Sequence, residues 1–580
     1  MFWRMLAGLS LVVFLSPPAL AQFAPSAPEV ESALEIKPAA RAKSYMVAAA
    51  NPLAVDAGTD ILKAGGTATD AAIAVQLVLN IVEPQSSGLG GGGFLLHWDQ
   101  KARQLKSYDG RETAPAAATP ERFLKPDGTP RAFGEVVFGG QSVGTPGLLR
   151  MLELAHKKHG RLPWAQLFQP ALKLADEGFA VSARLHKSLM ELGPRNFDTR
   201  ARAFYFDVAG APRPVGHRLQ SPAFAQTLRA IAEQGADAFY TGPMADAIVA
   251  AVADAPNHTG DLTREDLAAY RAKERQPVCI DYRRHKICGM GPPSSGALTV
   301  GMTLKILEPF DLGTVPLNAR AMHAIVEAQK LAYADRDRYI ADSDVVPVPQ
   351  GLTDPAYLAE RRKLIDITKA GPKATAGSPP GTRRKKAGID ATIESAGTSH
   401  ISIIDRAGNA IALTTTIENA FGARVMAAGF LLNNQLTDFS FRSKDAEGRD
   451  IANAIGPGKR PRSSMAPTII FGPDGRVKAV LGSPGGNRII LYVLKATIAM
   501  IDWKMEPQAA AELANFGSRN GPLEIEATMA GPMPALHMKA LGHEVIAQRM
   551  TSGLHIVMRR ADGTLDGGAD PRREGVARGE

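Results

Sequence analysis

The first half of the chain carries apolar residues at helical spacing, separated by short stretches rich in glycine and proline. Residues 54–82 predict two helices with a break at Ala64-Gly65-Gly66, and Thr69 or Asp70 is expected to cap the second. Further helices are predicted over 148–159, 164–177 (broken or kinked at Pro170), 222–234, 244–252 and 319–341.

The second half changes to the two-residue alternation that is typical of strands. A linker rich in Gly, Pro, Ser and Thr, residues 370–388, comes first, and strands are then expected to dominate from Thr398 to Leu481. A helix is predicted over residues 487–501. Because strands and helices are interleaved without a βαβ rhythm, we predict a layered α+β sandwich rather than a doubly wound sheet.

The register of one predicted hairpin follows from its loop. We expect residues 406–408 to form a three-residue loop in which Gly408 takes the left-handed conformation, so that Asp405 pairs with Asn409. Counting back along both strands places Thr398 opposite Thr416. Because side chains alternate between the two faces of a strand, Thr416 and Glu418 share one face.

Two cysteines are predicted to face each other across a second hairpin. Cys279 and Cys288 lie at equal distances from a turn at Arg283-Arg284. A cross-strand disulfide and a pair of reduced, half-buried thiols fit this pattern equally well, and an oxidising compartment would favour the disulfide.

The N-terminus has the pattern of a signal peptide. Arg4 precedes an apolar run over residues 6–15 and the small-residue site Ala19-Leu20-Ala21, which predicts removal of residues 1–21. A membrane anchor is the less favoured interpretation because the run is well short of about 20 residues. The mature protein is therefore expected to be periplasmic or secreted, without a membrane anchor.

The net charge of +9 raises the question of a nucleic-acid partner. The basic residues are scattered apart from the run 383–386, which lies in the linker without aromatic neighbours and is best interpreted as a solvated segment. The 12 histidines show no paired HExxH spacing. No nucleic acid, metal or other cofactor is predicted. The glycine run 90–93 lacks the Gly-Lys-Ser/Thr of a P-loop, which favours close backbone packing.

The dipeptide Gly397-Thr398, at the start of the first predicted hairpin, is the strongest candidate for a catalytic site. A threonine hydroxyl beside the hydroxyl of Thr416 and the carboxylate of Glu418 is what a self-cleaving enzyme with an N-terminal nucleophile needs. Taken alone, a threonine-rich segment is more often an ordinary strand. Further motifs elsewhere in the chain favour the catalytic interpretation over the ordinary strand.

Several blocks, in this order along the chain, resemble the gamma-glutamyltranspeptidase family over roughly residues 40–573. They are NIVEPQSSGLGGGGF (80–94), DGRETAP (109–115), GTPG (144–147), PPSSG (292–296), LNNQLTDF (432–439), RPRSSM (460–465) and GSPGG (482–486). The resemblance implies a four-layer αββα sandwich of the N-terminal nucleophile hydrolase type. It also implies a precursor that cuts itself at Gly397-Thr398 into a large subunit, 22–397, and a small subunit, 398–580, which share one core.

The resemblance makes Thr398 the nucleophile. Its hydroxyl needs a base, and the α-amine released by cleavage, with a pKa near ~7.7–8, can serve. Thr416 would orient the hydroxyl or the amine. Gly485 and Gly486 offer backbone N–H groups at a helix start for the oxyanion of the tetrahedral intermediate.

A γ-glutamyl donor carries an α-carboxylate and an α-ammonium. Arg111 suits a bidentate hold on the carboxylate, and Ser463 and Ser464 match the paired serines of the family. The residues that match the ammonium site are Glu418, Gln435 and Asp438. Glu418 stands where some members have Asn, and Gln435 where others have Glu, so this chain mixes two patterns.

The resemblance therefore implies a γ-glutamyl hydrolase and transferase for glutathione and related γ-glutamyl amides. Water, an amino acid or a dipeptide would accept the acyl group. A glutaryl- or cephalosporin-type acylase of the same superfamily is the first alternative. A periplasmic amino-acid or peptide binding module is the non-enzymatic alternative.

Overall fold

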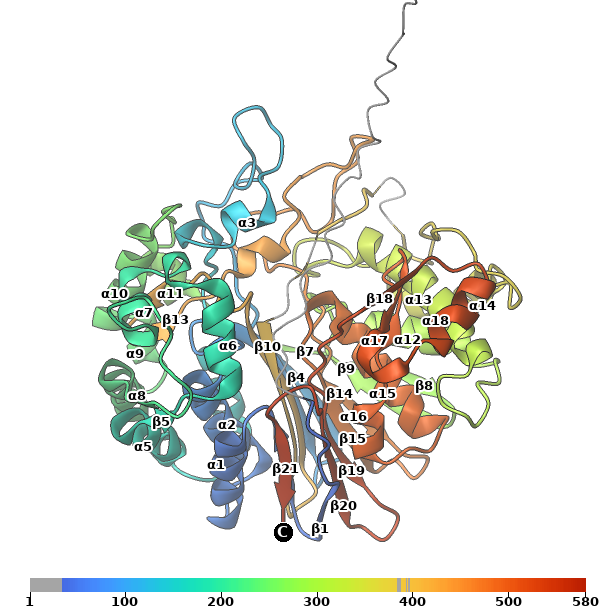
Figure 1. Ribbon diagram of the computed structural model, residues 1–580. Helices are drawn as coiled ribbons and strands as arrows, with labels where there is room; N and C mark the ends of the chain where they lie inside the picture. The colour runs from blue at the N-terminus through green and yellow to red at the C-terminus, as the bar shows by residue number, and fades with distance from the viewer. Residues whose placement is uncertain (1–33, 383–386, 393, 395–396) are drawn as a thin grey trace, which may run out of the picture.

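The computed structural model describes residues 34–382, 387–392, 394 and 397–580 (Figure 1). The predicted signal peptide and the basic run 383–386 lie outside these residues. Within the described part of the chain, no helix has the length and apolar character needed to cross a membrane.

Two seven-stranded antiparallel sheets form the centre of the molecule. In spatial order, the first sheet comprises β21 (Val576–Gly579), β2 (Met46–Ala49), β10 (Gly397–Ile404), β11 (Ala410–Glu418), β3 (Gly92–Asp99), β4 (Gln104–Asp109) and β7 (Lys273–Arg275). The second comprises β1 (Ala40–Ala42), β20 (Leu565–Ala569), β19 (His555–Arg559), β15 (Val477–Gly482), β14 (Thr468–Phe471), β9 (His285–Gly289) and β8 (Val278–Tyr282). Both sheets combine strands from before and after residue 397.

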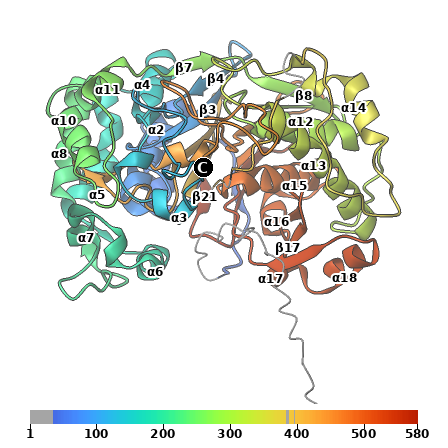
Figure 2. The same ribbon diagram turned by 90° about the horizontal axis from the view of Figure 1, so that it is seen from above.

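Helices cover the outer face of each sheet, as the two views in Figures 1 and 2 show. The layer beside the first sheet contains α1 (Pro52–Lys63), α2 (Ala68–Val82), α4 (Leu148–His159), α5 (Gln169–Glu177), α8 (Pro222–Gln234) and α10 (Gly242–Ala253). The layer beside the second sheet contains α12 (Gly296–Leu307), α13 (Ala319–Tyr339), α15 (Ile489–Ile501) and α16 (Pro507–Glu512).

Shorter elements lie around this frame. The remaining helices are α3 (Phe133–Val136), α6 (Ala183–Leu192), α7 (Thr199–Tyr205), α9 (Asp237–Tyr240), α11 (Arg264–Ala269), α14 (Pro355–Arg362), α17 (Ala527–Ala530) and α18 (Met533–Ala540). The short strands are β5 (Phe179–Ala180), β6 (Arg218–Leu219), β12 (Met426–Ala427), β13 (Phe430–Leu431), β16 (Phe516–Gly517), β17 (Leu523–Glu526) and β18 (Val545–Gln548).

The apolar core forms three layers, which explains the order helix, sheet, sheet, helix. Along β11, Leu413 packs toward α2 while its neighbour Ala412 packs between the sheets, as the period of two requires. Val480 lies in the same middle layer, and Leu481 beside it packs toward α15. The predicted four-layer αββα sandwich is confirmed.

Most predicted helices are present, with differences at their ends. The predicted N-cap of α2, Thr69 or Asp70, was wrong. Thr67 is the N-cap, and Asp70 completes a capping box as the third helical residue. The predicted break near Pro170 is confirmed, because a 3₁₀ turn, Trp164–Phe168, precedes α5 and Pro170 occupies its first turn.

The prediction that strands dominate from 398 to 481 fails over residues 419–467. Only β12, β13 and a 3₁₀ turn η5 (Gln435–Asp438) interrupt the loops there. The physical reason is backbone conformation, since Phe421, Gly422, Arg424 and Ala428 all have positive φ and cannot continue a strand. These loops carry much of the site described below.

Both predicted hairpin registers are present. Thr398 pairs with Thr416, and Gly408 closes the loop at φ 83°. Cys279 pairs with Cys288 across a turn whose residues Arg283 and Arg284 have φ of 49° and 66°. The structure joins the two cysteines in a disulfide, with the sulfur atoms 2.02 Å apart.

Candidate active site

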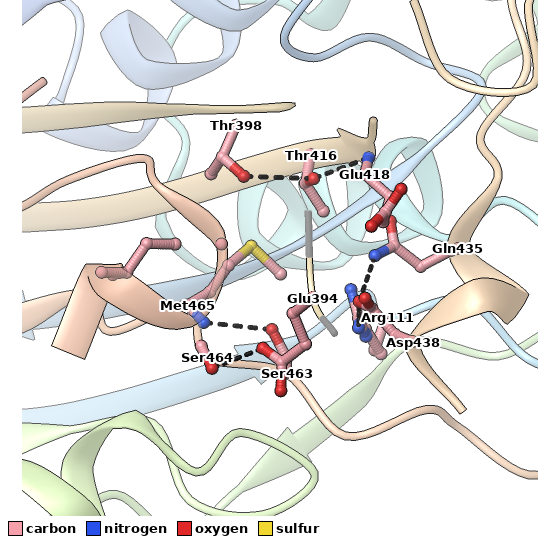
Figure 3. A pocket seen from close by; sticks show the side chains of 12 residues that line it. Arg111, Glu394, Thr398, Thr416, Glu418, Gln435, Asp438, Ser463, Ser464 and Met465 are labelled. Carbon is pink, nitrogen blue, oxygen red and sulfur yellow. Dashed lines mark hydrogen bonds and ion pairs between the residues drawn. The ribbon is translucent and has the colours of Figure 1, made fainter. Parts of the chain in front are cut away.

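A small pocket brings together residues from six separate parts of the chain (Figure 3). Its lining residues are Arg111, Glu394, Thr398, Thr416, Glu418, Gln435, Asp438, Ser463, Ser464, Met465, Gly486 and Ile489. All six predicted binding residues and both threonines are among them. Gly397 and Gly485 precede lining residues in the chain. The sequence analysis missed Glu394, Met465 and Ile489.

The two threonines form a chain of hydrogen bonds that ends at the Gly397 carbonyl. The Thr398 hydroxyl donates to Thr416 Oγ1 at 3.3 Å, and the Thr416 hydroxyl donates to the Gly397 oxygen at 2.7 Å. The Glu418 backbone N–H also donates to Thr416 Oγ1, at 2.8 Å. Thr416 is therefore placed to relay the Thr398 hydroxyl proton toward the Gly397 carbonyl oxygen, which it polarises.

The backbone is irregular at the same place. The register between β10 and β11 shifts between Gly397 and Thr398, so that Gly397 faces Glu418 instead of Ile417. Glu418 has φ of 80°, a left-handed conformation that costs a residue with a side chain roughly 1–2 kcal/mol. The shift sits at the bond predicted to be cut, and the Glu418 side chain lines the pocket.

Ser399 and His400 serve the framework rather than the pocket. The Ser399 hydroxyl donates to Glu83 Oε2 at 3.2 Å, within a buried group that includes Arg184. His400 bonds Thr414 Oγ1 at 2.8 Å through Nδ1. Burial and the neighbouring His555 hold the pKa of His400 well below its usual range, so its ring is neutral. A histidine with so low a pKa is a weak base, so His400 is unsuited to remove the proton of the Thr398 hydroxyl.

Arg111 and Asp438 form a buried ion pair across the pocket from the threonines. Arg111 Nη2 donates to Asp438 Oδ2 at 2.5 Å and to the Arg462 carbonyl at 2.9 Å, and Nε donates to the Pro461 carbonyl at 3.1 Å. Gln435 Nε2 donates to the same Asp438 oxygen at 2.7 Å. The guanidinium is therefore fixed in direction by three separate acceptors.

Three polar atoms in this group have no hydrogen-bond partner within the described chain. They are Arg111 Nη1, Asp438 Oδ1 and Gln435 Oε1, one donor and two acceptors. Burial raises the pKa of Asp438 to about 6, against the opposing effect of Arg111. One unsatisfied cationic donor beside two unsatisfied acceptors matches a ligand with adjacent negative and positive groups, such as an amino-acid head group.

One of the paired serines, Ser464, contacts Glu394, a residue that the sequence analysis did not identify. The Ser464 hydroxyl donates to Glu394 Oε2 at 2.5 Å, and Arg336 Nη2 contacts the same glutamate and donates to Ser464 Oγ at 2.7 Å. Burial would raise the pKa of Glu394, but Arg336 and Arg462 outweigh it and lower that pKa. Ser463 Oγ accepts from the Met465 N–H at 3.1 Å, which leaves its own proton to donate.

The glycine pair stands at the start of a helix, as predicted. Gly485 is the N-cap of the turn η6 (Gly486–Arg488), which leads into α15. Gly485 has φ of 135°, and a Cβ there would lie 2.6 Å from the Tyr492 ring. The first amides of a helix lack partners within it, so Gly486 offers a backbone N–H at the pocket wall.

One cluster outside the pocket resembles a metal-ligand set. His323, Glu327 and His543 have ligand atoms within 4.8 Å of one another. His323 Nδ1 and His543 Nε2 share a hydrogen bond of 2.8 Å, and Lys330 Nζ donates to Glu327 Oε1 at 2.8 Å. These side chains thus form hydrogen bonds within the cluster, and the Lys330 ammonium places a positive charge where a metal cation would have to bind.

Comparison with known proteins gives the family. The family profile described as gamma-glutamyltranspeptidase matches residues 54–580. The chain is 38% identical over 564 residues to the glutathione hydrolase proenzyme of Escherichia coli (strain K12), covering 95% of this chain and 94% of that protein. The solved cephalosporin acylase from Bacillus halodurans is similar with a TM-score of 0.81 and 28% identity, covering 94% of this chain and 97% of that one. Helicobacter pylori gamma-glutamyltranspeptidase is similar with a TM-score of 0.54 and 33% identity, covering 58% of this chain and 95% of that one. The chain belongs to the gamma-glutamyltranspeptidase family.

Proposed function

We propose that the protein is a γ-glutamyl hydrolase and transferase that acts on glutathione and related γ-glutamyl amides. The observation that carries the proposal is one pocket with a threonine hydroxyl relay at one side and the Arg111–Asp438 pair at the other. A γ-glutamyl group has its reactive carbonyl and its charged head at opposite ends, in the same arrangement.

The first reaction in this proposal is cleavage of the precursor. Thr398 Oγ1 attacks the Gly397 carbonyl carbon while its proton passes to Thr416 and the Thr416 proton passes to the carbonyl oxygen; this proton moves to the Thr398 nitrogen as the C–N bond breaks. The Gly397–Thr398 amide becomes an ester and releases the Thr398 amine. Water then hydrolyses the ester, which yields a large subunit ending at Gly397 and a small subunit beginning at Thr398.

The second reaction uses the amine that cleavage creates. The α-amine of Thr398, with a pKa near ~7.7–8, removes the hydroxyl proton as Oγ1 attacks the γ-carbonyl of the donor. Backbone N–H groups at Gly485 and Gly486 receive the oxyanion, and the leaving amine departs with a proton. Water, an amino acid or a dipeptide then takes the γ-glutamyl group from the ester. A binding module would need none of these groups.

Recognition of the donor follows from the unsatisfied atoms. Arg111 Nη1 and the Ser463 hydroxyl would hold the α-carboxylate, and Asp438 Oδ1, Gln435 Oε1 and Glu418 the α-ammonium. We further propose that residues 1–21 direct export, so that the mature enzyme works in the periplasm or outside the cell.

The acylase alternative is tested by a pair of donors that differ only in the α-amino group. The processed enzyme should hydrolyse γ-glutamyl-p-nitroanilide in strong preference to glutaryl-p-nitroanilide. Asp438→Asn should reduce the ratio of the two kcat/KM values by about tenfold or more, because it removes a charge-assisted contact to the ammonium. Asp438→Asn also removes the charge that pairs with Arg111, but this change affects the binding of both donors and therefore cancels in the ratio.

The same ratio should depend on pH. Since burial raises the pKa of Asp438 to about 6, its carboxylate gains a proton as the pH falls through about 6, and the preference should weaken there. Asp198→Asn, which alters a buried carboxylate that caps α7, is the control and should leave the ratio unchanged. A processed wild-type enzyme that hydrolyses both donors equally well would favour the acylase.

A further inference from the structure

Glu112 lies beside Arg111, fully buried and without hydrogen-bond partners. Its side chain has no exposed surface, and neither carboxyl oxygen accepts a hydrogen bond within the described chain. Glu112 Oε2 lies 3.6 Å from Arg111 Nη1, the one guanidinium nitrogen left without a hydrogen bond. The mechanism above leaves Glu112 without a role.

Two glycines make room for this carboxyl group. A Cβ on Gly92 would lie 2.5 Å from Glu112 Oε2, and a Cβ on Gly144 would lie 3.1 Å from Glu112 Cβ. Gly92 belongs to the glycine run 90–93, for which the sequence suggested only close packing. The run therefore admits an acidic side chain directly behind the guanidinium that faces the pocket.

Burial disfavours the ionised form of Glu112 more strongly than the surrounding charges favour it. Arg111 and Arg460 supply positive charge, Asp438 supplies negative charge, and Tyr270 lies nearby as a neutral phenol. Burial raises the pKa of Glu112 to about 8, and Arg111 opposes this rise only partly. At neutral pH the group is mostly a neutral carboxylic acid.

We propose that Glu112 is a positioning residue whose protonation state controls binding of the donor carboxylate. When neutral, it leaves Arg111 Nη1 to the substrate. When ionised, it becomes a second carboxylate on Arg111 besides Asp438, and an incoming α-carboxylate would be the third. This inference rests on the proposed function, in which Arg111 holds that carboxylate.

The consequence is that binding of an amino-acid head group weakens as pH rises. With a pKa near 8, the neutral fraction falls from about nine-tenths at pH 7 to about one-tenth at pH 9. Because affinity scales with the fraction of competent protein, the dissociation constant should rise about tenfold over this range. Binding at pH values near 8.5 should also take up protons.

The test is calorimetric titration of the processed wild type and of Glu112→Gln with L-glutamate, at pH 7 and pH 9. Gln is close in shape and cannot ionise, so the variant should bind comparably at pH 7 and lose much less affinity at pH 9. The ligand ammonium and the Thr398 amine also titrate here, but they are common to both proteins. A loss of equal size in both proteins would overturn the inference.

A second measurement requires no variant. Titrations of the wild type at pH 8.5 in two buffers with different ionisation enthalpies report the protons taken up on binding. We expect net uptake, and zero uptake would contradict the role of Glu112 even if Glu112→Gln fails to fold. A wild type that binds no L-glutamate at either pH would instead count against the proposed function itself.

Discussion

Thr398→Ala is expected to remain a single chain and to show no measurable hydrolysis of γ-glutamyl-p-nitroanilide, a loss of about 10⁴-fold or more. The substitution removes the hydroxyl that, in the proposed mechanism, attacks the Gly397 carbonyl through the relay with Thr416. Without cleavage, the N-terminal amine that we propose as the base would also not form. A denaturing gel and N-terminal sequencing of the smaller fragment measure the first effect, and a steady-state assay measures the second.

Two variants serve as controls for this experiment. Thr398→Ser keeps a hydroxyl and should still cut, more slowly. Ser399→Ala changes the next residue of the same strand, whose hydroxyl bonds Glu83 outside the pocket, and it should cut at Gly397–Thr398 as the wild type does. The assignment of the nucleophile fails if Thr398→Ala is cut, or if the natural small fragment begins at another residue.

Arg111→Lys is expected to lower kcat/KM for γ-glutamyl donors by about 2–3 kcal/mol, or roughly 30- to 150-fold, while precursor cleavage continues. The wild-type guanidinium lines the pocket, contacts Asp438 and two backbone carbonyls, and still has Nη1 without a hydrogen bond within the described chain. A lysine ammonium is a single point of charge and cannot make all of these contacts and also donate to a substrate carboxylate. Steady-state kinetics on processed protein measure the loss.

The matched control is Arg122→Lys. Arg122 makes a bidentate pair with Asp261 away from the pocket, so its replacement removes the same kind of contact. We expect it to affect stability and leave kcat/KM near the wild-type value. If a correctly processed Arg111→Lys enzyme has unchanged kinetics, Arg111 does not hold the donor carboxylate.

The sequence predicted the parts of the site that depend on local pattern. A three-residue loop and strict alternation were enough to pair Thr398 with Thr416, because register along a regular hairpin is set by its turn. The helix start at Gly486 followed from two glycines before an apolar helical run. These features need only neighbouring residues to be recognised.

The parts that the sequence missed depend on contacts between distant segments. Glu394 meets Arg336 and Ser464 from two other regions of the chain, and nothing in its own neighbourhood marks it. Glu112 stands in a recognised block, but its burial without partners is a property of the folded protein. The irregular loops over 419–467 were also missed, because positive φ at residues such as Phe421 is not encoded by any alternation of apolar and polar residues.

The interleaving of strands on either side of residue 397 changes the molecularity of unfolding. In the first sheet, β10 and β11 lie between β2 and β3, so a cut at Gly397–Thr398 leaves two polypeptides hydrogen-bonded along both sides of that pair. Neither can leave without breaking the sheet, and separation and denaturation become a single event. The melting temperature of the cut protein should therefore rise with protein concentration, whereas that of uncut Thr398→Ala should not. Differential scanning calorimetry over a hundredfold range of concentration would reveal the difference, and refolding of the cut protein would be a second-order encounter between two chains.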